Sequence, residues 1–477
     1  MNKLEDEKKG SNPIKGGAAQ YMLLKKLVII LTALVVVLLI SNTVLLIKLI
    51  SNSNERKDVA QKINGENYLE SSIASGSGTE EDPQVSGNLT EDNTDDSGAS
   101  SEKITDKTDD TSSEEISTTE TAVKSEDEEL DRQVEEILKG MTLHEKICQM
   151  FIVTPEELTG YETCTAAGEA TKACLNDYPV AGIIYFASNL ESREQTTEMI
   201  SNMKSYAKEI NGLPFFVSVD EEGGMVARCA DELGTTTFSN MYEYKDEGTE
   251  TAYNNARTIA EDISQFGFNL DFAPVADTWS NYDNTVIGKR AYSDDFEQTA
   301  ELVAAAVKGF NDGGVLCSLK HFPGHGDTSQ DSHSGAAYVT KGIEELEQEE
   351  LFAFKSGIDA GADFVMVGHL TMTGVDGMPA SFSYTMVTEE LKNKLGFKGV
   401  VITDALEMGA IANIYSSADA AVNCVEAGID IMLMPANLSG AVDGIKSAVE
   451  SGSITEERIN ESVRRIIKLK LKKLKDK

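Results

Sequence analysis

The chain has 477 residues, with 80 Asp and Glu against 42 Lys and Arg, and so carries a formal net charge of −38. This length allows more than one average domain, although a single α/β barrel often takes about 250 residues or more. A chain this acidic is not expected to bind nucleic acid, because phosphate contacts need clustered Lys and Arg. Six cysteines in this length also exclude a small disulfide-framework domain.

The segment 27–50, LVIILTALVVVLLISNTVLLIKLI, is mostly apolar and contains one charged residue, Lys48. It is longer than the roughly 20 residues that a helix needs to cross a bilayer, and it lacks the small-residue cleavage pattern of a signal peptide. Six Lys lie in residues 1–26, which favours a cytoplasmic N-terminus. We therefore expect a cytoplasmic segment over 1–26 and an uncleaved transmembrane signal-anchor over 27–50. This single pass through the cell membrane would leave the rest of the chain outside the cytoplasm. A buried core helix is the alternative.

Residues 51–130 are rich in Ser, Thr, Asp and Glu, carry a net charge of −16, and contain one aromatic residue, Tyr68. Such a segment cannot bury enough apolar surface to offset the entropy lost on ordering. The composition therefore predicts a disordered acidic linker, a stalk between the membrane and whatever follows.

Residues 131–477 have the composition of a globular domain in which helical and strand-like runs alternate. Eight short apolar runs lack the in-out alternation of a half-exposed sheet and are typical of strands covered on both faces. Several helical stretches between them close on Gly, as helix C-caps do. The pattern predicts a single (β/α)8 barrel; a doubly wound open sheet is the alternative, but no phosphate-binding glycine loop supports it. The runs are Met150–Val153, Gly182–Phe186, Phe215–Val219, Asn269–Ala273, Val315–Leu319, Asp363–Val367, Gly399–Thr403 and Ile429–Met434.

Titratable side chains follow five of these runs at the point where each run ends. In a (β/α)8 barrel the C-terminal ends of all strands meet on one rim, where the active site lies. We therefore expect these side chains to converge on that rim. They are Asp220, Asp277, Lys320 with His321, His369 and Asp404.

The segment 320–333, KHFPGHGDTSQDSH, contains three of the five histidines of the chain. Three interpretations stay open from the residues alone. His and Asp at this density can ligate zinc, although no H-E-x-x-H or H-x-H pair is present. Alternatively, Asp331 can hold one ring nitrogen of His333 and leave the other to move protons. The third interpretation is a surface loop with incidental histidines.

Asp404 ends the apolar run of residues 399–403. Such an Asp is often a helix N-cap, but a carboxylate opposite a proton donor is also what a retaining glycosidase requires. Asp220 and Arg228 flank an acidic Gly-Gly turn, and Arg290 lies in the loop after the fourth run. Carboxylates and Arg side chains placed together are suited to binding sugar hydroxyls.

Four motifs together resemble glycoside hydrolase family 3, and the likeness extends from about residue 141 to the C-terminal helix. The Asp-Ser-His element at 331–333 resembles the β-N-acetylglucosaminidase branch of that family. The resemblance implies a (β/α)8 barrel and retaining hydrolysis of terminal β-linked N-acetylglucosamine, with peptidoglycan fragments as the substrate class. The motifs are DEEGG…R at 220–228, VIGKR at 286–290, KHFPGHGDT…DSH at 320–333 and LKNKLGFKGVVITDALEMGAI at 391–411.

By this resemblance Asp404 matches the nucleophile, His333 the acid/base, and Asp331 the residue that orients His333. Neither a metal nor an organic cofactor is implied. A phosphorylase acting on the same sugar and a non-catalytic glycan-binding protein are the alternatives. Met225 stands where many relatives carry Arg, a difference that affects what lies beyond the first sugar. The positions matched to sugar binding are Asp220, Arg228, Arg290, Lys320 and His321.

Two further features lie outside these motifs. Cys164 and Cys174 share a polar insertion, and outside the cytoplasm we expect them to form a disulfide. The sequence Ser453-x-x-Glu456 predicts a capping box at the start of the C-terminal helix. The Lys-rich end of that helix, 468–477, is expected to be solvated, with contact to an anionic membrane as the alternative.

Overall fold

The structure, a computed structural model, describes residues 127–329, 332 and 335–474. The predicted cytoplasmic segment 1–26 and the predicted anchor 27–50 lie outside the described residues, as does the linker up to residue 126. In the part that is described, none of the helices combines the length and the apolar character needed to span a bilayer. Residues 127–140 are helical, so residues 127–130, assigned to the linker from the sequence, belong to a helix instead.

Within the described residues, eight parallel strands close into a barrel in the order β1-β12-β11-β9-β7-β6-β3-β2. Pairing of Phe151 with Met432 and of Ile152 with Leu433 closes the sheet, which confirms the predicted barrel and excludes the open sheet. Each predicted apolar run overlaps one barrel strand. The strands are β1 (Phe151–Val153), β2 (Gly182–Ile184), β3 (Phe216–Val219), β6 (Leu270–Asp271), β7 (Leu316–Phe322), β9 (Phe364–Val367), β11 (Val400–Ala405) and β12 (Ile431–Leu433).

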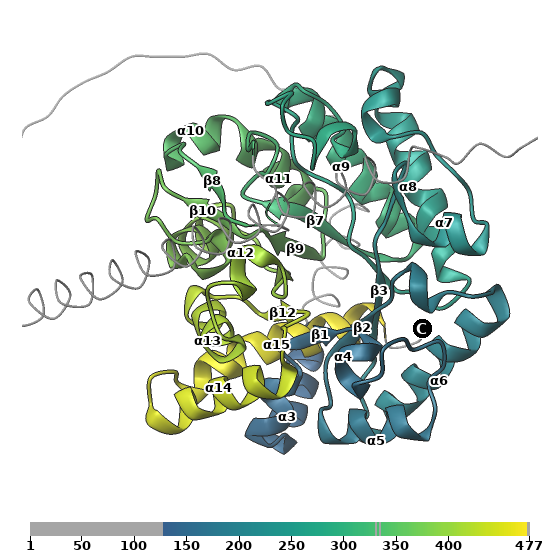
Figure 1. Cartoon of the computed structure of the whole chain (residues 1–477), viewed down its shortest axis with the longest axis vertical. Coiled ribbons are helices and arrows are strands. Elements are labelled where there is room, and N and C mark those ends of the chain that lie inside the picture. Colours follow the sequence, from purple (N-terminus) through teal and green to yellow (C-terminus); the bar gives the residue numbers. More distant parts are fainter. Residues whose placement is uncertain (1–126, 330–331, 333–334, 475–477) are drawn as a thin grey trace, which may run out of the picture. The chain divides into compact units, whose positions relative to one another are not determined.

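Helices connect consecutive barrel strands and surround the barrel (Figure 1). The connection between β9 and β11 is a π-helix, η5 (Thr385–Lys394). The larger helices are α5 (Glu169–Asp177), α6 (Arg193–Asn211), α8 (Thr249–Ser264), α9 (Phe296–Gly313), α11 (Glu350–Asp359), α13 (Ser417–Ala427), α14 (Leu438–Ser451) and α15 (Glu456–Lys473). The short helices are α3 (Leu143–Cys148), α4 (Pro155–Thr159), α7 (Arg228–Leu233), α10 (Ile343–Gln348), α12 (Gly409–Ala412), η1 (Ala187–Asn189), η2 (Met241–Glu247), η3 (Gly288–Arg290) and η4 (Ala380–Phe382).

Helix α9 illustrates how the sequence sets these boundaries. The side chain of Asp295 caps its first turn by accepting a hydrogen bond from the backbone N–H of Gln298 at 2.8 Å. Gly314 ends the helix in the left-handed region, with φ at 78°, where a residue without Cβ is favoured. A Cβ at Gly309 would lie 2.3 Å from the carbonyl oxygen of Tyr253, so this glycine permits the close packing of α9 on α8.

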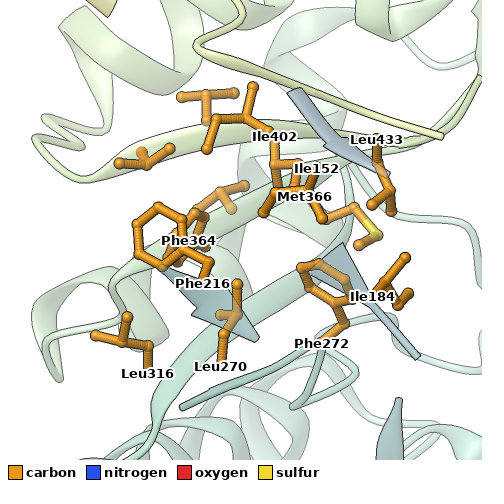
Figure 2. Packing of buried hydrophobic residues seen from close by; sticks show 14 of the residues in the cluster. Ile152, Ile184, Phe216, Leu270, Phe272, Leu316, Phe364, Met366, Ile402 and Leu433 are labelled. Atoms are coloured by element: carbon orange, nitrogen blue, oxygen red, sulfur yellow. The ribbon is translucent and has the colours of Figure 1, made fainter. Parts of the chain in front are cut away.

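The interior of the barrel is filled by apolar side chains contributed by every strand. Phe216 and Phe364 meet edge to face, with ring centroids 5.4 Å apart, a favourable geometry for an aromatic pair. Figure 2 shows these rings among the inward-pointing side chains. Four of these side chains, Ile184, Phe272, Met366 and Leu433, also line a cavity above them. Apolar side chains therefore fill the barrel interior, and the cavity lies at the end of the barrel where these four residues are found.

Two small sheets extend the loops at the C-terminal ends of the barrel strands. One is an antiparallel hairpin of β4 (Glu221–Gly223) and β5 (Val226–Ala227) after β3, and the other pairs β8 (Ala337–Val339) with β10 (Leu370–Met372). Strands β4 and β10 directly follow the barrel strands β3 and β9, so both sheets stand on the rim where the predicted site residues are expected.

The C-terminal helix α15 differs from the prediction at both ends. Thr455, not Ser453, is its N-cap, because the Thr455 hydroxyl accepts from the N–H of Arg458 while the Ser453 hydroxyl donates to the carbonyl of Ala448. Lys470 is buried rather than solvated, with Nζ 2.8 Å from Oε1 of Gln149. The Lys-rich end is thus partly an interior segment.

Candidate active site

A cavity of about 310 Å³ lies at the C-terminal end of the barrel. Its floor consists of the apolar side chains that top the barrel interior, and its walls carry charged groups from several strand ends. Polar groups converging above an apolar floor are typical of ligand pockets. The polar residues of the wall are Asp220, Glu222, Arg228, Arg290, Lys320, His321, Asp404 and Glu407.

Asp404 lies near the C-terminal end of β11 and faces this cavity. Its Oδ1 accepts a hydrogen bond from the backbone N–H of Ala405 at 2.8 Å, and the residue is only partly buried. Asp404 is therefore not a helix N-cap. Its position leaves the carboxylate within reach of a ligand in the cavity.

Lys320, at the end of β7, joins two carboxylates across the cavity wall. Its Nζ is 2.7 Å from Oδ1 of Asp220 and 2.6 Å from Oε1 of Glu222. Arg290 makes a two-pronged contact with the same Glu222, at 2.9 Å from Nε and 2.7 Å from Nη2. These four side chains come from three separate segments of the chain, and their pairing fixes the segments to one another.

The charges in this cluster support one another. Burial alone would raise the pKa of Glu222, but Arg290 and Lys320 outweigh it and hold that pKa well below its ordinary value. Burial would likewise lower the pKa of Lys320, but Asp220 and Glu222 outweigh it and raise that pKa. Glu222 and Lys320 are consequently charged at neutral pH. They present hydrogen-bond donors and acceptors in a fixed arrangement.

His321 is held by Asp277, which follows β6. The ring Nδ1 of His321 is 2.7 Å from Oδ2 of Asp277, and Asp277 Oδ1 also accepts from the backbone N–H of His325 at 2.6 Å. Burial would raise the pKa of Asp277, but His321 and His325 lower it below its ordinary value. Asp277 thus fixes the positions of His321 and His325.

Arg228 follows the β4–β5 hairpin and also lines the cavity. Its Nε is buried and has no hydrogen-bond partner among the described residues. The structure accordingly places Asp220, Arg228, Arg290, Lys320 and His321 on the same cavity as Asp404. His369 lies apart from this set, because it is buried and its ring nitrogens contact the Ser381 hydroxyl and the Ala405 carbonyl.

Asp331 and His333 lie outside the described residues, but Ser332 between them is described. Its hydroxyl is 2.9 Å from Nε2 of His325, and its carbonyl accepts from the backbone N–H of Ala410. Ala410 belongs to α12, which follows Asp404 by a few residues. Residue 332 is therefore attached to the segment that carries Asp404.

Two acidic residues of the wall were not assigned a role from the sequence. Glu222 lies two residues after Asp220, and side chains two apart on a strand point to the same side, a signal that can be used only once this segment is known to be extended. Glu407 follows Asp404 by three residues, and burial raises the pKa of Glu407. Burial, followed by the charge of Glu407, raises the pKa of the neighbouring Glu157 to about 9.

The expected disulfide between Cys164 and Cys174 is absent, and both are free thiols. The Cys164 sulfur is 3.3 Å from the hydroxyl of Thr159. The Cys164 backbone is held by Glu156, which accepts from its N–H at 2.7 Å, and by Asn189, which donates to its carbonyl at 2.9 Å. Hydrogen bonds therefore close this insertion in place of a covalent bridge.

Metal-binding geometry was one interpretation of the 320–333 loop. Over the ranges 127–329, 332 and 335–474, no three His, Cys, Asp or Glu side chains gather as metal ligands. His321 and His325 instead contact a carboxylate and hydroxyl groups of the protein.

Comparisons with known proteins indicate the family of the chain. A model of the glycosyl hydrolase family 3 N-terminal domain matches residues 142–469. The chain is 33% identical over 324 residues to beta-hexosaminidase A of Pseudoalteromonas piscicida, which covers 62% of this chain and 54% of that relative. It is 35% identical over 265 residues to a beta-hexosaminidase of Xylella fastidiosa, covering 54% and 77%.

A solved structure of the same family is also similar to this chain. The glycoside hydrolase family 3 beta-N-acetylglucosaminidase from Paenibacillus sp. str. FPU-7 superposes with a TM-score of 0.66 at 37% identity, covering 71% of this chain and 64% of that one. The chain spans about half the length of beta-hexosaminidase A of Pseudoalteromonas piscicida. Because the family model covers more than half of the sequence, the chain belongs to glycosyl hydrolase family 3.

Proposed function

We propose that the chain is a retaining exo-β-N-acetylhexosaminidase that removes terminal β-linked N-acetylglucosamine from glycans. The observation that carries the proposal is the position of Asp404, which lines a cavity together with Lys320 and Arg290. The names of the similar proteins, beta-hexosaminidases and a beta-N-acetylglucosaminidase, support the same activity. A cavity of about 310 Å³ is at the small end of ligand pockets and suits one terminal sugar.

The proposed chemistry proceeds in two displacements. An Asp404 carboxylate oxygen attacks the anomeric carbon while His333 donates a proton to the departing glycosidic oxygen, which leaves a glycosyl ester on Asp404. His333, now neutral, takes a proton from water, and the resulting hydroxide displaces Asp404 from the anomeric carbon. Asp331 orients the imidazole and stabilises its protonated form. A neutral imidazole beside Asp404 avoids the repulsion between two close carboxylates.

The charged wall supplies binding in this proposal. Asp220 and Glu222 accept hydrogen bonds from sugar hydroxyls, while Lys320, Arg290 and Arg228 donate to sugar oxygens. Because Lys320 and Arg290 are already paired with carboxylates, their side chains are ordered before substrate arrives. Binding therefore costs little additional side-chain entropy.

The test is release of p-nitrophenol by the full chain from the β-N-acetylglucosaminide and from the β-glucoside. We expect turnover of the acetylated sugar only, unaffected by EDTA and lost in Asp404→Ala and in His333→Ala. Faster turnover with added phosphate would identify a phosphorylase. A folded chain that binds the sugar without turning it over would be a glycan-binding protein, and inhibition by EDTA would favour the metal interpretation.

We further propose that the substrates are peptidoglycan-derived glycans and that residues 27–50 anchor the enzyme in the cell membrane with the barrel outside. The proposed anchor and its orientation are supported by the apolar segment 27–50 and by the Lys-rich residues before it. Protease added to intact cells is expected to release the barrel. Protection from the protease until the cells are lysed would contradict this orientation.

A further inference from the structure

Three aromatic side chains form a cluster on loops at the C-terminal end of the barrel. The ring centroids of Tyr242 and Trp279 are 5.1 Å apart, and those of Trp279 and Tyr282 are 5.2 Å apart, both in edge-to-face geometry. Tyr282 is 64% exposed, and the other two rings are partly buried. Exposed aromatic surface on a single-chain fold commonly marks a binding site.

The loop that carries Trp279 and Tyr282 also forms part of the cavity. It connects β6 to α9, and its residue Arg290 reaches into the cavity to bind Glu222. The N–H of Asn281 donates to the carbonyl of Gly326 at 3.3 Å, which joins this loop to the segment that follows His321. Trp279 and Tyr282 therefore stand on the loop that supplies Arg290 to the cavity wall, and this loop is joined to the segment that follows His321.

The segment that carries Tyr242 is attached to another part of the cavity wall. The side-chain oxygen of Asn240 accepts from the backbone N–H of Met225 at 3.0 Å. Met225 is 63% exposed at the tip of the β4–β5 hairpin, and Val226 and Arg228 beside it line the cavity. The segment that carries Tyr242 is therefore joined to the hairpin whose residues line the cavity, and Met225 adds exposed apolar surface to that hairpin.

The cluster is held in place by its own hydrogen bonds. Trp279 donates from Nε1 to the carbonyl of Asn284 at 3.1 Å and packs against Val275, Ile287 and Ala291. The hydroxyls of Tyr242 and Tyr282 both donate to Asp294, whose charge is paired with Lys245. Rigid aromatic side chains give a large contact area at low cost in conformational entropy.

The chemistry of this surface selects its ligand. The carboxylate that the hydroxyls of the cluster contact, Asp294, is paired with Lys245, so the aromatic rings are the main binding feature of the surface. Aromatic rings edged by hydroxyl and indole groups match a sugar ring, which has apolar C–H faces and polar edges. When the terminal sugar fills a cavity of about 310 Å³, the next sugar must lie at its mouth.

We propose that Tyr242, Trp279 and Tyr282 form the binding surface for the sugar on the reducing-end side of the scissile bond. The inference rests on the proposed function and adds its substrate class: the enzyme favours β-linked oligosaccharides over glycosides of small aglycones. The surface contributes affinity for the leaving group and takes no part in bond cleavage.

Trp279 is the one tryptophan of the chain, so its fluorescence reports directly on this surface. The full chain carrying Asp404→Asn is titrated with the β-1,4-linked disaccharide of N-acetylglucosamine and, separately, with the monosaccharide, while calorimetry records binding. We expect the disaccharide to change the emission in a saturable manner and the monosaccharide to leave it nearly unchanged. Calorimetric binding of the disaccharide without a change in emission would overturn the inference.

Steady-state kinetics provide a second test of the proposed binding surface. Tyr282→Ala is expected to lower kcat/KM for the disaccharide by about three- to tenfold and to lower kcat/KM for the p-nitrophenyl glycoside by a smaller factor, because its aglycone is smaller than a sugar residue. Tyr282→Phe, which keeps the ring, should behave like the original chain. Tyr384→Ala is the matched control, because Tyr384 is 55% exposed and lines a separate cavity with Lys392 and Arg458.

The outcomes separate the two proposals. Equal loss on both substrates in Tyr282→Ala, or no loss on the disaccharide, would overturn the binding surface while leaving the hydrolase intact. Failure of the unaltered chain to cleave either substrate would overturn the proposed function itself.

Discussion

At the scale of single residues, the charge balance of the cavity depends on Glu222. This carboxylate is buried and accepts hydrogen bonds from Arg290 and Lys320, the two cations of the wall. Two buried cations that share one carboxylate are stable only while that carboxylate is ionised. Asp220, the second partner of Lys320, does not contact Arg290 through any hydrogen bond among the described residues.

Glu222→Gln is therefore expected to destabilise the protein by about 3–5 kcal/mol, the usual cost of leaving a buried charge unpaired. Urea unfolding measures this loss as a lower midpoint. KM for the aryl N-acetylglucosaminide should rise as well, because Arg290 and Lys320 lose their fixed positions.

The control for this substitution is Glu243→Gln, which removes an ion pair with Lys289 on the surface. Exposed pairs contribute little to stability, so its urea midpoint should stay close to that of the original chain. Equal effects of the two substitutions would show that burial of the Glu222 pair carries no particular cost.

Sequence reasoning at this scale identified the positions that line the cavity but not how they are paired. Three adjacent acids, Asp220, Glu221 and Glu222, could not be ranked without the hairpin that follows. In the structure Glu221 points away from the cavity and accepts from the backbone N–H groups of Cys229 and Ala230. The alternation of side chains along a strand separates the three, and that alternation is known only once the hairpin is known.

At the scale of elements, helix α15 carries a buried Lys470 on its inner face. Its Nζ is 2.8 Å from Gln149 Oε1 and 4.9 Å from the centroid of the Phe216 ring. Burial lowers the pKa of this lysine to about 7, against an unfolded value of about 10.4.

The folded state therefore binds fewer protons than the unfolded state between about pH 7 and pH 10.4, and the free energy of unfolding should rise with pH across that range. Lys470→Met removes the cost of burying the charge. We expect it to stabilise the protein by about 1–4 kcal/mol at pH 7, with a gain that shrinks as the pH approaches 10.4.

Urea unfolding at a series of pH values measures this difference, and Lys472→Met on the exposed face of α15 is the control. A Lys470→Met gain that is constant across the series, or a loss at pH 7, would contradict the account. The sequence showed a Lys-rich helix end but not which lysine faces inward, since Lys470 occupies the apolar stripe set by Ile459, Val463 and Ile466.

At the scale of the whole molecule, the barrel was predictable because its strands are buried on both faces and read as unbroken apolar runs. Their parallel arrangement follows from the alternation with helices, whereas closure is established by the pairing of β1 with β12. The π-helix η5 and the β8–β10 pair were not predicted, because each depends on contacts between segments distant in sequence. Cys164 and Cys174 show the same limit, since two thiols in one loop do not indicate where their side chains point.

Deletion of residues 1–126 tests whether the barrel works independently of what precedes it. We expect kcat/KM for the aryl N-acetylglucosaminide to stay within about twofold, because the cavity is lined by residues 184–434 and a segment with the composition of residues 51–126 is not expected to form a core. The melting temperature of the deleted chain should match the barrel transition of the full chain. A loss of activity with the fold retained would show that the N-terminal segment contributes to the site.

The central claim is that Asp404 forms a covalent ester with the sugar, and the most direct test is to trap that ester. The full chain is incubated with a slow fluorinated analogue of an N-acetylglucosaminide and mapped by peptide mass spectrometry. The account predicts one added sugar on the peptide containing Asp404, absent in Asp404→Ala. A sugar attached to another residue, or turnover of the analogue with no covalent adduct, would contradict it.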